Sequence, residues 1–329
     1  MKVVIILILV ATLGAGGWFM YSSKQQALAQ AEVEQAQLAA QLAPGGVPVF
    51  AGGAQMSVAA KQSLDEADTL WNAAGGDPVT GAQAPNMARL YSTALRGLYN
   101  QPGLKDREEA LIKDRLSPLA QALFFSKTNW PADRLFGTHV VSSGENPEAI
   151  AKKYGMSREF LNRLRGKDVN DSKLRIGDSL KILRLNEQQG ADKGFALRID
   201  KGDYVMDLFI GGMFAKRYII SHGAKESPTP NGKTRLINRV YHPDWTHPIT
   251  KQVLKFGDPE NILGPIWMPF DAKELGESGI GIHGYTGVDG KMQAQVSHGC
   301  IRLQNADAEE FYQILSHPDR SPCAVEIAD

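Results

Sequence analysis

The sequence predicts a multidomain protein with an N-terminal transmembrane helix, a small all-α bundle, a βααβ module and a mainly-β C-terminal domain with one covering helix. Three observations lead to this prediction. The 329-residue chain begins with a long uncharged run, the segments that follow have apolar residues at helical spacing, and beyond residue 193 short apolar runs alternate with Gly and Pro. The predicted parts are 1–23, 24–56, 57–131, 137–185 and 193–329.

The first part carries targeting information. No charged residue lies between Val3 and Ser23, and Lys2 supplies a positive flank. Because about 20 apolar residues span a bilayer, we expect 1–23 to be a membrane anchor, with the rest of the chain exported. The alternative is a cleaved signal peptide, since Ala-Leu-Ala at 27–29 resembles a cleavage site.

The charge composition excludes one class of partner. The chain has 36 Lys and Arg residues and 36 Asp and Glu residues, and it has no long basic or acidic tail. A protein with this balance has no net electrostatic field that attracts nucleic acid. We therefore expect no nucleic-acid partner.

The second and third parts are predicted to be mostly helical, with one linker between their helices. Residues 24–42 are rich in Gln, Ala and Glu, as in a polar helix, and two Pro and four Gly in 43–55 indicate a linker. Residues 57–126 then contain three apolar runs at helical spacing. These runs are Leu64, Ala67, Leu70 and Trp71; Met87, Leu90, Tyr91, Ala94 and Leu98; and Leu111, Leu116, Leu119, Ala120 and Leu123. The bundle indicates no function.

The fourth part is predicted to fold as strand, helix, helix and strand, at 139–142, 147–154, 158–164 and 180–183. Val-Val-Ser-Ser-Gly-Glu at 140–145 and Leu-Arg-Ile-Gly-Asp-Ser-Leu-Lys-Ile at 174–182 resemble a LysM domain. The resemblance implies a βααβ fold that binds the N-acetylglucosamine-containing glycan of peptidoglycan or chitin. The alternative is a spacer of the same fold that binds no glycan.

The fifth part is predicted to be mainly β. Strands at 195–199, 204–210 and 214–221 are separated by short polar or Gly-Gly turns, as in an antiparallel meander. Near the end of the chain we expect a helix from about Ala306, capped by Asn305, and a last strand at 324–327. The buried face of this helix is expected to contain Ala308, Phe311, Tyr312 and Leu315.

Candidate chemistry is concentrated in two short stretches of the fifth part, Gly-Ile-His-Gly at 281–284 and Ser-His-Gly-Cys-Ile-Arg-Leu at 297–303. A thiol becomes a competent nucleophile when an adjacent base or cation favours the thiolate. His283 and His298 are both available to Cys300. Gly299 permits a tight turn, in which the N–H groups of Gly299 and Cys300 can form an oxyanion hole.

Residue types alone leave two other interpretations open for these side chains. The Cys and two His could bind zinc, but a fourth ligand is not evident. Cys300 could instead be a buried structural residue. Cys323, the only other cysteine, lies in an apolar strand-like context and is expected to be a small core residue, so we expect no disulfide.

The order of the residues resembles the signature of YkuD-type L,D-transpeptidases, a His followed later by Ser/Thr-His-Gly-Cys and then Arg or Asn. Thirteen residues separate His283 from Ser297. Ser-Pro-Thr-Pro-Asn-Gly at 227–232 and Leu-Gly-Pro-Ile-Trp at 263–267 resemble the family's Thr-Pro-x-Gly and Leu-Gly-x-x-Trp segments. The resemblance spans about 193–329.

The resemblance implies a β-rich cysteine acyltransferase that acts on bacterial peptidoglycan without a cofactor. Cys300 would attack the amide bond after the third stem-peptide residue, release the terminal D-residue and transfer the acyl group to an amine, forming a 3→3 cross-link. His283 would be the general base, with Gly284 where the family sometimes has Ser. His298 would position the loop, and the N–H groups of His298, Gly299 and Cys300 would stabilise the oxyanion.

Substrate-binding candidates follow from the same resemblance. Arg302 is expected either to hold a substrate carboxylate or to brace the loop, and aromatic residues are expected to wall the peptide groove, although core packing is the alternative for Trp267. The candidates are Arg302, Ser297, Tyr285 and Trp245, together with Tyr241 and Trp267.

The acceptor of the acyl group stays open at this point. The same acyl-enzyme could transfer its acyl group to water, which would make the protein a carboxypeptidase, or to the lysine of a wall-attached protein. A non-catalytic scaffold that binds peptidoglycan through the LysM-like module is a further alternative. In each case we expect the protein in the bacterial cell envelope, anchored in the cytoplasmic membrane with its catalytic part in the periplasm.

Overall fold

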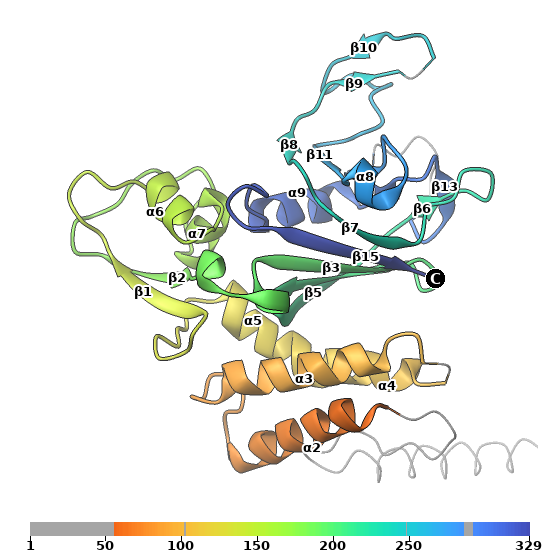
Figure 1. Cartoon of the computed structure of the whole chain (residues 1–329). Coiled ribbons are helices and arrows are strands. Elements are labelled where there is room, and N and C mark those ends of the chain that lie inside the picture. The colour runs from red at the N-terminus through yellow and green to blue at the C-terminus, as the bar shows by residue number, and fades with distance from the viewer. Residues whose placement is uncertain (1–55, 102, 248, 286–291) are drawn as a thin grey trace, which may run out of the picture. The chain divides into compact units, whose positions relative to one another are not determined.

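The computed structural model describes residues 56–329 except 102, 248 and 286–291 (Figure 1). The chain divides into two compact units, Met1–Gly53 and Ala54–Asp329, and every described residue belongs to the second. The predicted anchor at 1–23 and almost all of the polar helix and linker at 24–56 therefore lie outside the described residues. Within the described ranges, no helix is both long and apolar enough to cross a membrane.

The predicted bundle consists of two helices and a third that contains a π-helical turn. Helices α2 (Val58–Ala73) and α3 (Ala84–Leu98) pack on each other, and α4 (Lys105–Leu111) continues through the π turn (Ile112–Leu116) into α5 (Ser117–Phe125). The N–H of Ser117 bonds to the carbonyl of Ile112, five residues back. Pro118 follows directly, and because its ring clashes with a regular helical turn, the wider π turn accommodates it.

Residues 136–183 form a small unit with the chain order strand, helix, helix, strand. Strand β1 (Phe136–Val140) pairs antiparallel with β2 (Ser179–Leu183), and α6 (Pro147–Lys153) and α7 (Arg158–Leu164) lie between them in sequence. The first strand begins and ends earlier than the predicted 139–142. Its early end has a local cause, because the carboxylate of Glu145 accepts the N–H of Ser142 at 2.8 Å and turns the chain.

The remainder is mainly β, as predicted, and its largest sheet has the order β5-β4-β3-β15-β7. The predicted meander is confirmed, because the first of its three strands pairs antiparallel with the second, and the second pairs antiparallel with the third. The last strand of the chain then enters the sheet beside the first, in parallel. The strands are β3 (Phe195–Asp200), β4 (Val205–Ile210), β5 (Met213–Ile219), β7 (Gly232–Arg235) and β15 (Cys323–Ala328).

A second sheet, of order β14-β12-β11-β8, carries the residues of interest. Its strands are β8 (Val240–Tyr241), β11 (Ile266–Pro269), β12 (Gly281–His283) and β14 (Ile301–Arg302). Two further pairs are β6 (His222–Gly223) with β13 (Gln295–Ser297), and β9 (Trp245–Thr246) with β10 (Val253–Leu254). One short helix, α8 (Ala272–Leu275), lies in a region where the sequence predicted none.

Helix α9 (Asn305–Ile314) packs one buried face against the β structure. It buries Ala308, Phe311 and Ile314, and the ring of Phe311 meets that of Tyr218 on β5 at 5.6 Å. The predicted cap is wrong, because Asn305 is already the first helical residue and caps nothing with its side chain. That side chain instead accepts the backbone N–H of Tyr285 at 2.7 Å.

The helical region packs on the largest sheet through a buried charged network. All six residues of β4 are buried, and α3 and α5 both contact β5. Asp207 of β4 is fully buried and bonds to Arg217 of β5 at 2.7 Å and to the hydroxyl of Tyr99 at 2.6 Å. Glu108 of α4 also bonds to Arg217. The helical region therefore completes the fold of the β domain.

Candidate active site

Three neighbouring strands of the second sheet align Trp267, His283 and Arg302 in one row. Trp267 is opposite His283, and His283 is opposite Arg302. The residues one position earlier, Ile282 and Ile301, are also paired and are fully buried. Because side chains alternate between the two faces of a sheet, the row of three lies on the face opposite this isoleucine pair.

Cys300 lies at one end of this face, directly before β14, and is partly exposed. Since β12 and β14 are parallel and Ile282 is opposite Ile301, the same register continued by one residue places Cys300 level with Gly281. His283 is two positions further along β12, roughly 6.6 Å in strand rise. If the alternation of the strand extends back to Cys300, the thiol faces the same side of the sheet as the imidazole of His283.

The environment of the Cys300 thiol keeps it protonated. Burial raises its pKa above the usual thiol value, whereas the N–H of Gly281 and the positive charge of Arg302 act in the opposite direction. The sulfur donates to the carbonyl of Gly279 at 3.6 Å. Because the thiolate is the nucleophilic form, reaction requires a base. His283 is the imidazole placed on the same face to supply it.

Two buried hydroxyls hold the loop that carries Cys300. The hydroxyl of Thr229 donates to the carbonyl of Gly299 at 2.8 Å, and that of Ser297 donates to the carbonyl of Cys300 at 2.6 Å. Gly299 itself has a φ of 97°, a conformation that L side chains rarely adopt. The sequence prediction of a tight turn at Gly299 is confirmed. Ser297, predicted to bind substrate, lies under the loop and is 2% exposed.

The same loop presents unused backbone donors. Across the described part of the chain, the N–H groups of His298, Gly299 and Cys300 have no protein acceptor. His298 is exposed, and because Gly299 breaks the extended geometry, the two-residue spacing from Cys300 does not place the two side chains as neighbours on a strand. Within the described residues its ring makes no hydrogen bond or ring contact, and its predicted role in positioning the loop stays a prediction.

The end of β12 is held by Asn305 and by a close approach at Gly284. A Cβ atom at Gly284 would lie 2.5 Å from both Asn305 Oδ1 and Pro265 Cδ, so no larger residue fits without movement. Asn305 Oδ1 accepts the N–H of Tyr285. Gly284 is therefore a packing position beside His283.

Arg302 lies inside the site, at 6% exposure. Its guanidinium carbon is 6.0 Å from the ring centre of Tyr285. Its backbone is also fixed, because Arg302 and Ser221 exchange two N–H to carbonyl bonds, at 2.8 and 3.0 Å. Of the two roles expected from the sequence, this burial favours bracing of the loop.

The aromatic candidates separate onto different parts of the fold. Trp267 lies beside His283, with ring centres 6.2 Å apart. Tyr241 is aligned with Ile266, on the opposite face, and its ring is tilted against that of Tyr312 of α9, with ring centres 5.1 Å apart. Tyr241 thus lies on the other face of the sheet from Trp267, and its place in a peptide groove stays a prediction. Trp245 is on the β9–β10 hairpin, which extends away from the other strands (Figure 1), and its role stays a prediction.

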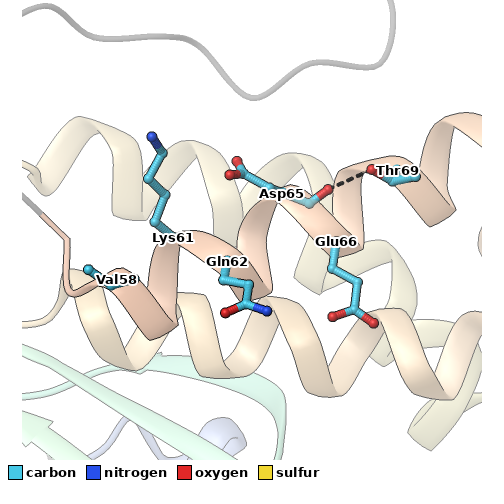
Figure 2. A pocket seen from close by; sticks show the side chains of 6 residues that line it. All are labelled: Val58, Lys61, Gln62, Asp65, Glu66 and Thr69. Carbon is cyan, nitrogen blue, oxygen red and sulfur yellow. Dashed lines mark hydrogen bonds between the residues drawn. The ribbon is translucent and has the colours of Figure 1, made fainter.

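A hollow elsewhere on the described surface offers no comparable chemistry. A surface hollow on α2 lies far from Cys300 in sequence and is lined by ordinary surface side chains (Figure 2). Its lining residues are Val58, Lys61, Gln62, Asp65, Glu66 and Thr69. Among the described residues, no three His, Cys, Asp or Glu side chains gather as metal ligands would. Cys323 is buried in β15, where burial raises its pKa, and both cysteines are free.

Comparison with known proteins identifies the region that contains this site. Residues 194–325 match the family model of the L,D-transpeptidase catalytic domain, named YkuD. This part of the chain is similar to an L,D-transpeptidase catalytic domain. The resemblance of 193–329 to this family, predicted from the sequence, is supported at the level of the catalytic domain. The unit at 136–183 lies outside the matched residues.

Two relatives from Bacillus subtilis (strain 168) have names that assign them to the L,D-transpeptidases. YqjB is 31% identical over 98 residues, which cover 30% of this chain and 53% of the relative. YkuD is 27% identical over 183 residues, which cover 56% of this chain and 96% of the relative. The chain thus spans about half the length of the first relative.

Among solved structures, an L,D-transpeptidase variant from Enterococcus faecium has 19% sequence identity and a TM-score of 0.32. The match covers 50% of this chain and 59% of that one. A likeness of this size supports no further argument.

Proposed function

We propose that this protein is a peptidoglycan L,D-transpeptidase that forms 3→3 cross-links through an acyl-enzyme on Cys300. The observation that carries the proposal is the arrangement of β12 and β14. Strand β12 carries the imidazole of His283, and the loop directly before the parallel strand β14 carries the thiol of Cys300 and three N–H groups that have no acceptor in the described residues. A nucleophile, a base and an oxyanion site are the parts that acyl transfer requires.

In the first half-reaction, the sulfur of Cys300 attacks the carbonyl carbon of the bond that follows the third stem-peptide residue. His283 accepts the thiol proton as the carbon–sulfur bond forms. The carbonyl oxygen becomes an oxyanion, which the loop N–H groups stabilise. His283 then protonates the leaving amine and the carbon–nitrogen bond breaks. The terminal D-residue departs, and the remaining acyl group is bound to Cys300 as a thioester.

In the second half-reaction, the side-chain amine of a neighbouring stem peptide attacks the thioester. His283 takes a proton from this amine, the carbon–sulfur bond breaks, and the thiol is restored as the new amide leaves. Water in place of the amine would give a carboxypeptidase, and a protein lysine would give wall attachment. Trp267 and Tyr285, which flank His283 and Arg302, contact the stem peptide in this proposal.

The unit at 136–183 is a LysM domain that holds wall glycan in this proposal, and its β1-α6-α7-β2 order supports the assignment. It packs directly on the catalytic domain. Arg163 of α7 bonds to the side chain of Gln313 at 2.8 Å and to Glu310 at 3.1 Å, both on α9. Glycan and stem peptide would therefore be held by one compact unit.

The proposed location is the periplasmic side of the cytoplasmic membrane, with 1–23 as the anchor. The support is the uncharged sequence from Val3 to Ser23, which is long enough to span a bilayer.

Mass spectrometry of muropeptides tests the activity. The full chain in detergent is incubated with disaccharide-tetrapeptides, and we expect a cross-linked dimer that has lost one terminal D-residue. A Cys300→Ala variant should give none, and a Cys323→Ser variant is the matched cysteine control. A tripeptide product alone would identify water as the acceptor. Unchanged tetrapeptide with the unsubstituted chain would contradict the proposal.

A further inference from the structure

A buried threonine lies behind the nucleophile loop. Thr229 is 1% exposed, and its hydroxyl joins two segments of the domain. It accepts the N–H of Gly223 at 3.0 Å and donates to the carbonyl of Gly299 at 2.8 Å. A hydroxyl has a single proton. The oxygen of Thr229 accepts the N–H of Gly223, so the hydroxyl proton is the one that points to the carbonyl of Gly299.

The bond to Gly299 has a consequence for the next residue. The carbonyl of Gly299 and the N–H of Cys300 belong to one peptide unit, which is planar and trans. In such a unit the two groups point in opposite directions. A carbonyl held toward Thr229 therefore directs the N–H of Cys300 away from the interior, and this N–H has no protein acceptor in the described residues.

The backbone of Thr229 is itself restricted. Pro228 and Pro230 flank it, and a residue before proline is confined to extended conformations. Its carbonyl also accepts the ammonium group of Lys201 at 2.9 Å. The hydroxyl thus has little freedom to follow a shift of the loop, and it can act as a fixed reference for Gly299.

We infer that Thr229 is a positioning residue that orients the N–H of Cys300 as an oxyanion donor. The inference rests on the proposed acyl transfer at Cys300 and goes beyond it by assigning a role to a residue that does not touch the substrate. Loss of a complete oxyanion donor costs about 10²–10³-fold in rate. A donor that remains but is no longer held should cost less, about 10- to 100-fold.

The test compares two reactions of the same thiol in the full-length protein. Acylation by a carbapenem proceeds through an oxyanion, whereas alkylation by iodoacetamide displaces iodide at a saturated carbon and forms none. Both rates are measured for Thr229→Val, which removes the hydroxyl at nearly constant shape, and for Thr229→Ser, which restores it. Thr234→Val is the matched control, because Thr234 is 5% exposed and its hydroxyl also donates to a backbone carbonyl, that of Asp271, at 3.1 Å.

We expect Thr229→Val to lower the acylation rate about 10- to 100-fold while the alkylation rate and its pH profile stay unchanged. Thr229→Ser should recover most of the acylation rate, and Thr234→Val should change neither. Equal losses in acylation and alkylation, or no loss in either, would overturn the inference, as would a serine variant as slow as the valine variant. If the unsubstituted protein is alkylated but never acylated, the proposed function fails, and the role of Thr229 fails with it.

Discussion

The side chain of Asn305 accepts the backbone N–H of Tyr285 at 2.7 Å, which ties the first residue of α9 to the segment that follows His283. The two residues are 20 positions apart in the sequence. The bond fixes the end of β12 at the point where Gly284 allows no larger side chain. The position of the proposed base therefore depends on a helix that contributes no catalytic group.

Asn305→Ala should weaken both the fold and the reaction. The substitution removes this exposed hydrogen bond, and a typical intramolecular hydrogen bond contributes about 0.5–1.5 kcal/mol. We expect a lower melting temperature and slower acylation of Cys300. Gln304→Ala is the control, because Gln304 is the exposed neighbouring residue and its side chain caps nothing. Equal acylation rates for the two variants would show that Asn305 does not position the base.

A carbapenem should form one covalent adduct per chain, on Cys300. A strained β-lactam carbonyl should react with a thiol that lies beside an oxyanion site. Intact-mass analysis should show the adduct in the unsubstituted protein and in Cys323→Ser, but not in Cys300→Ala. Peptide mapping without reductant should find no link between Cys300 and Cys323. An adduct that survives Cys300→Ala would rule out the assigned nucleophile.

The two histidines should differ in their effects. His283→Ala removes the proposed base, so acylation should fall by about 10²–10⁴-fold, the usual contribution of general acid–base assistance. His298 is exposed, and His298→Ala should change acylation and the melting temperature little. This differs from the sequence-based expectation that the ring holds the loop. A large loss in His298→Ala with active His283→Ala would exchange the two roles.

The pH dependence of alkylation should report the charges around Cys300. Burial raises the pKa of the thiol, and the nearby negative charge of Glu277 raises it further. Glu277→Gln removes a charge that disfavours the thiolate, so the pKa should fall and the rise of the iodoacetamide rate should move to lower pH. Glu274→Gln, three residues away and also exposed, should not shift the profile. A shift toward higher pH in Glu277→Gln would contradict this sign.

Residues 193–329 should not be stable alone. Removing the helical region exposes the side of β5 that α3 and α5 contact and leaves the buried Asp207 of β4 without the hydroxyl of Tyr99. Loss of apolar burial costs roughly 25 cal/mol per Å². We expect this fragment to aggregate or to bind a hydrophobic dye, whereas a fragment of 57–329 should unfold cooperatively. A soluble, cooperatively unfolding 193–329 fragment would show that the helical region is dispensable.

Local sequence was sufficient for the elements that depend on periodicity and for the chemistry held in one contiguous motif. The meander at 195–219 follows from short apolar runs and tight turns, and α9 from apolar spacing. A candidate nucleophile could be predicted because Ser-His-Gly-Cys places the thiol, the turn glycine and the backbone donors within four residues. These groups share one short loop.

Tertiary structure decided everything that depends on register and on contacts between distant segments. Thr229 is 70 residues from Gly299, and no periodicity in either segment indicates that the two are bonded. Tyr241 lies in the short strand β8 and Trp267 lies in the short strand β11. The pairing of β8 with β11 nevertheless places the two side chains on opposite faces of the sheet. A shift of one residue in that pairing would exchange the faces. The sequence alone thus predicted which residue reacts, because the motif is contiguous, whereas the pairing of distant strands decided which residues surround it.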